Sequence, residues 1–229
     1  MNLRVKTQTK NLFLELLTWT KIMRLICSII LTVFFINPVL ANEKLYVEGN
    51  TLHYNTDLAA DDMNAEINWE DVNIIEEILL ENAEITTIQL NSSGGLLTAA
   101  QYISDLVIDF ELDTYVSGEC SSGCVDIFLA GNKRVLERGS WLGFHKSSWD
   151  AGNIERYYEL NKEEEGWNNA FEFSSWLYED TQSDILKQMK YMLERGVEAD
   201  FIIQTLQADS EGMWYPRRKQ LEAAGVLTE

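Results

Sequence analysis

From residue 45 onward, short β-favouring apolar runs alternate with longer runs whose apolar residues recur at helical spacing. A hairpin is predicted over 45–54, and a helix capped by Asn68 follows it. Alternation of strands and helices on this scale is typical of an α/β domain built from repeated crossover units. We therefore predict an α/β fold. Later strands are expected over 85–90, 114–116, 134–136 and 141–144, and later helices over 98–110 and 121–130.

Residues 150–197 do not continue this alternation. They are rich in acidic residues and contain Trp167 and Trp176, and we interpret them as a helical insertion. Because neither a low-complexity linker nor a repeat divides the chain, we predict one domain over residues 42–229. Two short helices are expected to close that domain, near 201–206 and 217–224.

In the first 41 residues, basic residues, an apolar run and a small-residue site follow one another as in a targeting segment. Lys21 and Arg24 precede an apolar run, and Val39-Leu40-Ala41 offers a small-residue cleavage site. This order predicts a signal peptide over 1–41, and therefore a periplasmic or secreted protein. An uncleaved segment would act as a membrane anchor, although its apolar core is shorter than the roughly 20 residues of a membrane span. The stretch before Met23 exceeds what a signal peptide needs, so the true start is either the first methionine or Met23.

Acidic residues outnumber basic ones by a wide margin. The chain holds 37 Asp and Glu against 18 Lys and Arg, which gives a net charge of −19. The predicted signal peptide contains five of the basic residues and one acid, so its removal makes the protein still more acidic. Such a surface repels nucleic acid and anionic lipid, because both bind basic patches. We therefore expect no nucleic-acid partner.

Two cysteines, Cys120 and Cys124, remain once Cys27 leaves with the signal peptide. A spacing of four places their Cα atoms roughly 6 Å apart on a helical turn, within the range of a disulfide. A disulfide around Ser122 and a pair of buried thiols are both compatible with this pattern. A zinc site formed by the two cysteines and His145 would need an unusual gap between its ligands. We expect neither a metal nor a cofactor.

Ser122 is the favoured nucleophile, because its small neighbours let the backbone turn tightly and expose the hydroxyl. The N–H of Gly123 is then free to face an oxyanion, and Gly94 or Gly95 would supply a second donor. A helix-capping role is the structural alternative for this serine. His145 is the candidate base, since the only other histidine of the predicted mature chain is His53 in the opening hairpin.

These motifs resemble a known family. Asn91–Gly95, Cys120–Cys124, Leu129–Gly131 and Gly143–His145 are similar to the proteolytic-subunit family of Clp protease and its relatives in the crotonase-like superfamily. Poorly characterised secreted bacterial members of that group are the most similar. The resemblance covers about residues 85–147 well and the C-terminal end more faintly. It implies a single domain with a repeated ββα superhelix.

The resemblance also implies roles for residues. Ser122 would attack a peptide carbonyl, His145 would act as base, and the N–H groups of Gly95 and Gly123 would form the oxyanion hole. The family places an acid ahead of a terminal helix that ends in glycine, as in Leu221–Val226. Counting back from that glycine favours Asp209 as the third catalytic residue. Asp200 is the second choice, and the acid would orient the histidine.

Several positions depart from the family pattern. Ser93 stands where the family has a proline, and Gly123 where it has a larger apolar residue. Little of the acidic segment 150–197 matches the region that binds peptide and forms ring contacts in the family. Signal-peptide peptidases share the fold but use a serine–lysine pair, and Lys146 is not placed as their lysine is. A location outside the cytoplasm removes the ATP-driven unfoldase partner.

The combined prediction is an extracytoplasmic serine peptidase that acts on peptides or unfolded protein. A non-catalytic binding or assembly module with the same fold is the main alternative. Acyl-CoA chemistry of the crotonase kind is a further alternative, but no basic phosphate cradle is evident in the sequence. The resemblance implies a homo-oligomer, while the residues themselves do not fix the number of subunits.

Overall fold

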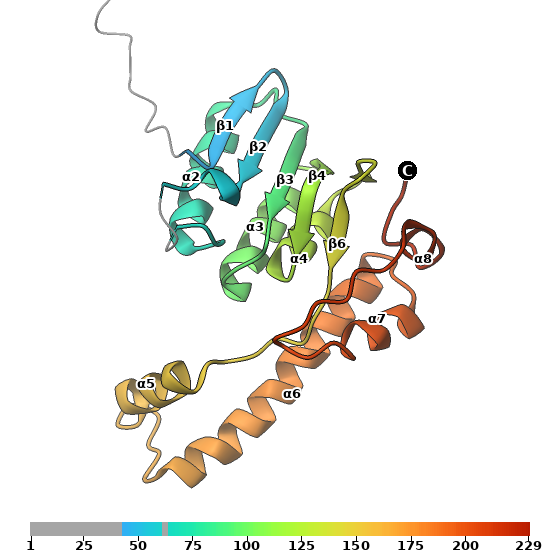
Figure 1. The fold of residues 1–229 in the computed structure, drawn as a ribbon. Coiled ribbons are helices and arrows are strands. Elements are labelled where there is room, and N and C mark those ends of the chain that lie inside the picture. Colours follow the sequence, from blue (N-terminus) through green and yellow to red (C-terminus); the bar gives the residue numbers. More distant parts are fainter. Residues whose placement is uncertain (1–42, 61–63) are drawn as a thin grey trace, which may run out of the picture. The chain divides into compact units, whose positions relative to one another are not determined.

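The computed structural model describes residues 43–60 and 64–229. The predicted signal peptide and both candidate start residues lie outside these ranges. Within them the chain forms an α/β structure with one sheet (Figure 1), so the predicted fold class is confirmed. No helix in the described ranges is long and apolar enough to cross a membrane.

The described residues form a six-stranded sheet in the order β1-β2-β3-β4-β5, and β6 pairs with the second half of β4. The predicted hairpin is antiparallel, whereas every later pairing is parallel. Parallel neighbours require crossover connections, and α2, α3 and α4 provide them. The strands are β1 (Leu45–Glu48), β2 (Thr51–Asn55), β3 (Thr87–Ser92), β4 (Asp113–Ser121), β5 (Arg134–Leu136) and β6 (Trp141–Gly143). The crossover helices are α2 (Trp69–Glu81), α3 (Leu97–Asp109) and α4 (Gly123–Ala130).

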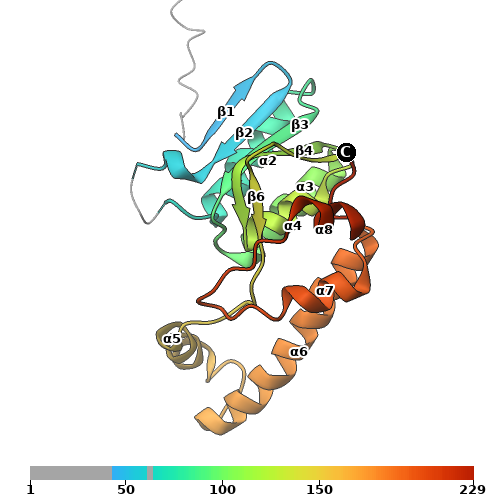
Figure 2. The ribbon, with the colours of Figure 1, turned by 45° about the vertical axis from the view of Figure 1, so that its right-hand side comes forward.

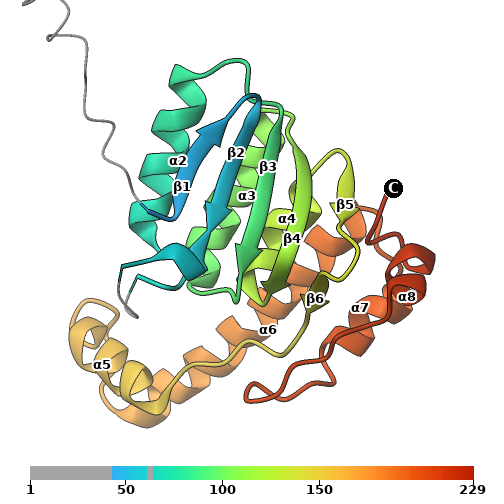
Figure 3. The ribbon, with the colours of Figure 1, turned by 45° about the horizontal axis from the view of Figure 1, so that its top comes forward.

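One face of the sheet carries these helices (Figure 3). Burial alternates along the strands, so that Ile88 and Leu90 of β3 and Val116 of β4 point into the core while their neighbours are half-buried. Helix α4 differs from the other two, because all eight of its residues are buried. It therefore lies in the core of the domain, and Ser122 directly precedes it in the chain.

A buried ion pair fastens the hairpin to α2. Asn68 and Asp71 form a capping box at the start of this helix, as the sequence predicted for Asn68. The Asp71 carboxylate lies 2.6 Å from the Lys44 ammonium and accepts a 2.6 Å hydrogen bond from the Tyr54 hydroxyl. It also accepts from the Asn68 backbone N–H. A cation and two further donors thus satisfy this carboxylate within the fold.

Strand β4 is longer than predicted and continues to Ser121, which the sequence analysis had placed at the start of a helix. Ser121 pairs with Gly143 of β6, and this pairing keeps the backbone extended for those last residues. A positive φ of 112° at Gly118, together with a register shift between β3 and β4, lets the strand leave its first partner and join its second. The helix consequently begins two residues later than predicted.

Residues 150–197 contain helices α5 (Ala151–Asn161) and α6 (Ala170–Glu194). Asp150 and Asn169 cap them. The two helices share an aromatic cluster, in which Trp167 packs 4.9 Å from Trp176 between ring centroids. Tyr157 of α5 stacks on Trp176 of α6 and contacts Trp167 between the helices, so the two tryptophans singled out in the sequence contribute to the packing of this helical pair.

The C-terminal segment packs back against the sheet (Figure 2). It contains α7 (Ala199–Thr205) and α8 (Arg218–Ala223). Between these helices Trp214 pairs with Phe144, just after β6, through backbone hydrogen bonds of 2.9 and 2.8 Å. A further backbone bond joins Lys146 to Ala208. The segment that follows β6 is therefore held on one side by the last quarter of the chain.

Candidate active site

Ser122 lies at the tight turn between β4 and α4. Its φ of 53° and ψ of −129° belong to a region that non-glycine residues rarely adopt, and such a conformation costs about 1–3 kcal/mol. The turn is fixed because the Ser122 N–H donates to the Gly143 carbonyl at 3.0 Å. Its side chain makes no capping hydrogen bond to α4. The hydroxyl is thus presented away from the helix, and the alternative role of a simple helix cap does not describe it.

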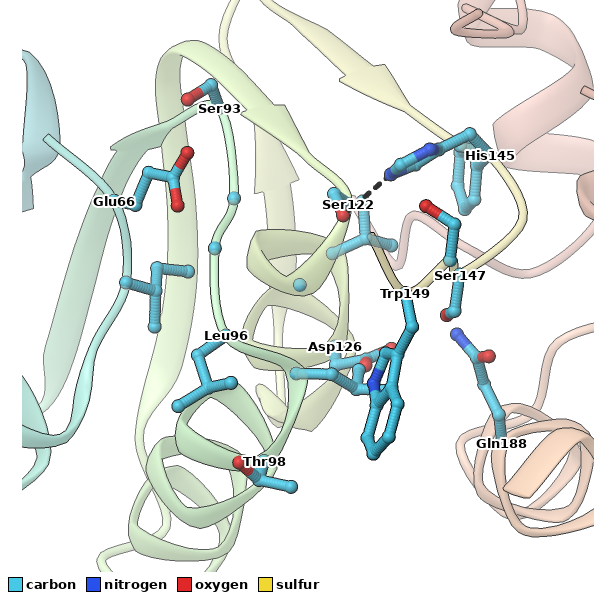
Figure 4. A pocket seen from close by; sticks show the side chains of 18 of the residues that line it. Glu66, Ser93, Leu96, Thr98, Ser122, Asp126, His145, Ser147, Trp149 and Gln188 are labelled. Atoms are coloured by element: carbon cyan, nitrogen blue, oxygen red, sulfur yellow. Dashed lines mark hydrogen bonds between the residues drawn. The ribbon is translucent and has the colours of Figure 1, made fainter. Parts of the chain in front are cut away.

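The base predicted from the sequence lies beside this serine. His145 follows β6, and its Nε2 atom is 2.8 Å from the Ser122 Oγ atom (Figure 4). Its Nδ1 atom is 3.1 Å from the backbone carbonyl oxygen of Ser210. Because a carbonyl oxygen only accepts hydrogen bonds, this contact requires the proton on Nδ1. In the neutral imidazole, Nε2 then carries no proton and is able to accept the serine proton.

The glycine loop with Gly94 and Gly95 lies close to Ser122 and Gly123. A Cβ atom at Gly94 would lie 2.7 Å from the Ser122 Cβ, so only glycine allows this approach. The bridge to Ile67 uses the Gly94 carbonyl and the Leu96 N–H, which leaves the Gly95 N–H directed away from it. In the described part of the chain neither Gly95 nor Gly123 donates its N–H to a protein acceptor. Both donors remain available beside the serine.

Asp209 does not take the position predicted for it. Its carboxylate is exposed and lies 2.9 Å from the Lys146 ammonium rather than at the imidazole of His145. The neighbouring residue contacts the imidazole instead, through the main-chain carbonyl of Ser210. The second choice, Asp200, is an exposed acid in the first turn of α7. Among the described residues, the structure therefore brings Ser122 and His145 together without a carboxylate behind the histidine.

The two cysteines form a disulfide, one of the alternatives left open by the sequence. Cys120 at the end of β4 bonds to Cys124 of α4, with Cα atoms 5.2 Å apart. The bond uses both sulfurs, so they are not free to hold zinc with His145. Among the described residues no group of three or more Cys, His, Asp or Glu side chains could hold a metal ion. The disulfide joins the strand and the helix on either side of Ser122.

A cleft of about 930 Å³ opens in front of the serine (Figure 4). Its walls come from the glycine loop, the start of α4, the segment after β6, and helices α5 and α6. Among the described residues that line it, four are acidic and none is a lysine or arginine. The acids are Glu66, Asp126, Asp150 and Asp184. The cleft is therefore large enough for an extended peptide side chain and carries negative charge.

Asp126 is the functional candidate that the sequence analysis missed. It lies in α4, four residues after Ser122, and is only 4% exposed although it lines the cleft. Burial raises the pKa of Asp126 to about 7, and a hydrogen bond from Gln188 opposes that rise. The available signal was a single acid inside the apolar run Val125–Ala130, where helix burial leaves little reason for a charge.

The fold is similar to that of a protein of known structure. No protein-family model and no curated protein matches the sequence. Among solved structures, the chain is similar to a point mutant of ClpP1 from Listeria monocytogenes, with 19% sequence identity and a TM-score of 0.51. The match covers 72% of this chain and 85% of that one. The protein therefore has a ClpP-like fold, as the resemblance implied.

Proposed function

We propose that the protein is a serine-type peptidase that acts outside the cytoplasm on peptides or unfolded segments of proteins. The observation that carries this proposal is the 2.8 Å contact between a strained serine and a histidine of defined tautomer. Two unpaired N–H donors lie next to the same serine, where a tetrahedral intermediate would develop its negative charge. A nucleophile, a base and an oxyanion site are the groups that acyl transfer requires.

The reaction follows from these positions. His145 Nε2 takes the proton of Ser122 as its Oγ atom attacks the peptide carbonyl carbon. The N–H groups of Gly95 and Gly123 stabilise the oxyanion, and the imidazolium then protonates the leaving amine. Water, deprotonated by the same histidine, hydrolyses the acyl-enzyme and restores the serine. The Ser210 carbonyl holds His145 in the tautomer that both steps need.

A neutral carbonyl behind His145 is expected to stabilise the imidazolium less than a carboxylate does. A carboxylate would stabilise the imidazolium that forms during attack, whereas a carbonyl dipole stabilises it less. We therefore expect slower turnover than a complete serine–histidine–aspartate triad gives. This same observation favours the second candidate, a binding module that keeps the fold without catalysis. Acyl-CoA chemistry is disfavoured, because among the described residues that line the cleft there is no lysine or arginine to bind phosphates.

A fluorophosphonate probe tests the proposal, because it reacts with an activated serine. We expect the purified protein to be labelled at Ser122, and labelling to vanish in Ser122→Ala and to fall by at least about a hundredfold in His145→Ala. Ser183→Ala is the matched control, since it removes an exposed hydroxyl on α6 that lies outside the cleft. Absence of labelling in the folded wild-type protein would overturn the peptidase proposal and favour the binding module.

A further inference from the structure

The side chain of Asp126, in the first turn of α4, lines the same cleft as Ser122. Ser122 precedes the first residue of α4, and Asp126 lies one turn further on. Both residues line one cleft, and Figure 4 draws the Asp126 side chain below Ser122. A side chain of a peptide held at Ser122 would therefore extend toward this carboxylate.

Asp126 has no cation next to it in the described part of the chain. The Gln188 amide is the neighbour that hydrogen-bonds its carboxyl group, and Gln188 is neutral. Tyr191 is also close, but its hydroxyl donates to the Asp126 backbone carbonyl, at 2.6 Å. Asp71, by contrast, is equally buried and lies against Lys44. A desolvated carboxylate without a cation is destabilising, and a positively charged ligand would offset that penalty.

The walls of the cleft suit a long basic side chain. Val125 and Met192 present apolar surface that the methylene groups of lysine or arginine would cover. Trp149 is half exposed and lines the same cleft (Figure 4), so its indole face is available to a cation. The remaining acids, Glu66, Asp150 and Asp184, add negative potential that attracts cationic peptides into the cleft.

We propose that the cleft selects peptides with a lysine or arginine side chain at the residue whose carbonyl faces Ser122, and that Asp126 is the counter-charge that binds it. This specificity rests on the proposed function, because that function places the carbonyl of the bound peptide at Ser122. It concerns binding as well as hydrolysis, so it predicts a preference that persists when the nucleophile is removed.

Binding to the Ser122→Ala variant tests the proposal independently of catalysis. The probes are two short acetylated peptides that differ only in a central lysine or norleucine, and isothermal titration gives their affinities. We expect the lysine peptide to bind about 10–100-fold more tightly, since a charge-assisted hydrogen bond contributes about 1.5–3 kcal/mol. Adding Asp126→Asn should abolish this preference. Adding Asp109→Asn, which removes an exposed acid of α3 outside the cleft, should preserve it.

Labelling with phosphonate probes separates this proposal from the proposed function. The probes are diphenyl phosphonates with a lysine-like or a leucine-like side chain next to the phosphorus. Faster labelling of wild-type protein by the lysine-like probe supports both proposals. Equal labelling by the two probes, or equal affinity for the two peptides, overturns the specificity while the peptidase stands. No labelling combined with a lysine preference in binding overturns the peptidase alone.

Discussion

Asp71 and Asp126 are both buried carboxylates in crossover helices, but they differ in what surrounds them. Asp71 has the Lys44 ammonium, the Tyr54 hydroxyl and a backbone N–H within hydrogen-bonding distance. Asp126 has the neutral amide of Gln188 and a cleft in front of it. The first carboxylate is satisfied by the fold, whereas the second lacks a counter-charge. Burial alone therefore does not distinguish the two acids, whereas a cation beside the carboxylate does, among the described residues.

Removal of the cation beside Asp71 should have the largest effect on stability. Lys44→Met leaves a buried carboxylate without its ion pair, which costs about 3–5 kcal/mol of the free energy of unfolding. Urea unfolding measures this loss. Lys133→Met is the matched control, because it removes a lysine from an exposed pair with Glu229 and should cost less than about 1 kcal/mol. Similar losses in both variants would show that Asp71 does not depend on Lys44.

The opposite result is expected at Asp126. Its pKa is raised from 3.8 to about 7 in the folded protein, so the folded state holds the proton more tightly than the unfolded state. The stability this gives is fully present below about pH 4 and is lost as the pH rises through about 7. Asp126→Asn imitates the protonated form. It should therefore stabilise the protein at pH 8 and have little effect at pH 4.

The urea midpoint of Asp126→Asn and wild-type protein across this pH range checks that prediction. The charged and titratable groups around the cleft are the same in both proteins, so the difference isolates one carboxyl group. These groups are Glu66, His145, Asp150, Tyr157, Asp184 and Tyr191. A loss of stability at pH 8 would mean that Asp126 already has a stabilising partner, and the contrast with Asp71 would disappear.

Asp209 should show the smallest effect, because it is exposed and pairs with a lysine at the surface. Asp209→Asn is expected to change the rate of fluorophosphonate labelling by less than about fivefold, the range of an exposed ion pair. A stopped time course of labelling at pH 8 measures it, with Lys146→Met as a control that breaks the same pair from its other side. A much larger fall in Asp209→Asn alone would place its carboxylate behind His145 after all.

Residues whose roles depend on local pattern could be predicted from the sequence. The hairpin, the Asn68 cap and the crossover helices follow from periodicity and capping preference, because these act over a few residues. Ser122 and His145 could be proposed because small neighbours and a scarcity of histidines narrowed the choice. Their contact itself is a tertiary feature, which depends on the parallel pairing of β6 with β4.

The missed features have different physical causes. The partner of His145 is a main-chain carbonyl at Ser210, and residue types along a sequence carry no information about which carbonyl is used. Ser121 stays in β4 because Gly143 pairs with it, a contact of long sequence separation. Asp126 lies in an apolar helix, and a single acid does not change the prediction of a buried helix. Asp126 becomes a candidate only when the cleft that it lines is known, and the walls of this cleft include α5 and α6.

The pairing of Phe144 with Trp214 joins the segment after β6 to a part of the chain that is synthesised about 70 residues later. The serine, its strained turn and the glycine loop all belong to the first 123 residues, while the carbonyl that orients the histidine comes from residue 210. A nascent chain or a degradation fragment that ends before this pairing contains Ser122 and His145 without the Ser210 carbonyl that contacts the imidazole. If Ser122 and His145 act as proposed, such a fragment should not react with a fluorophosphonate probe, and reactivity should require the last quarter of the polypeptide to have docked.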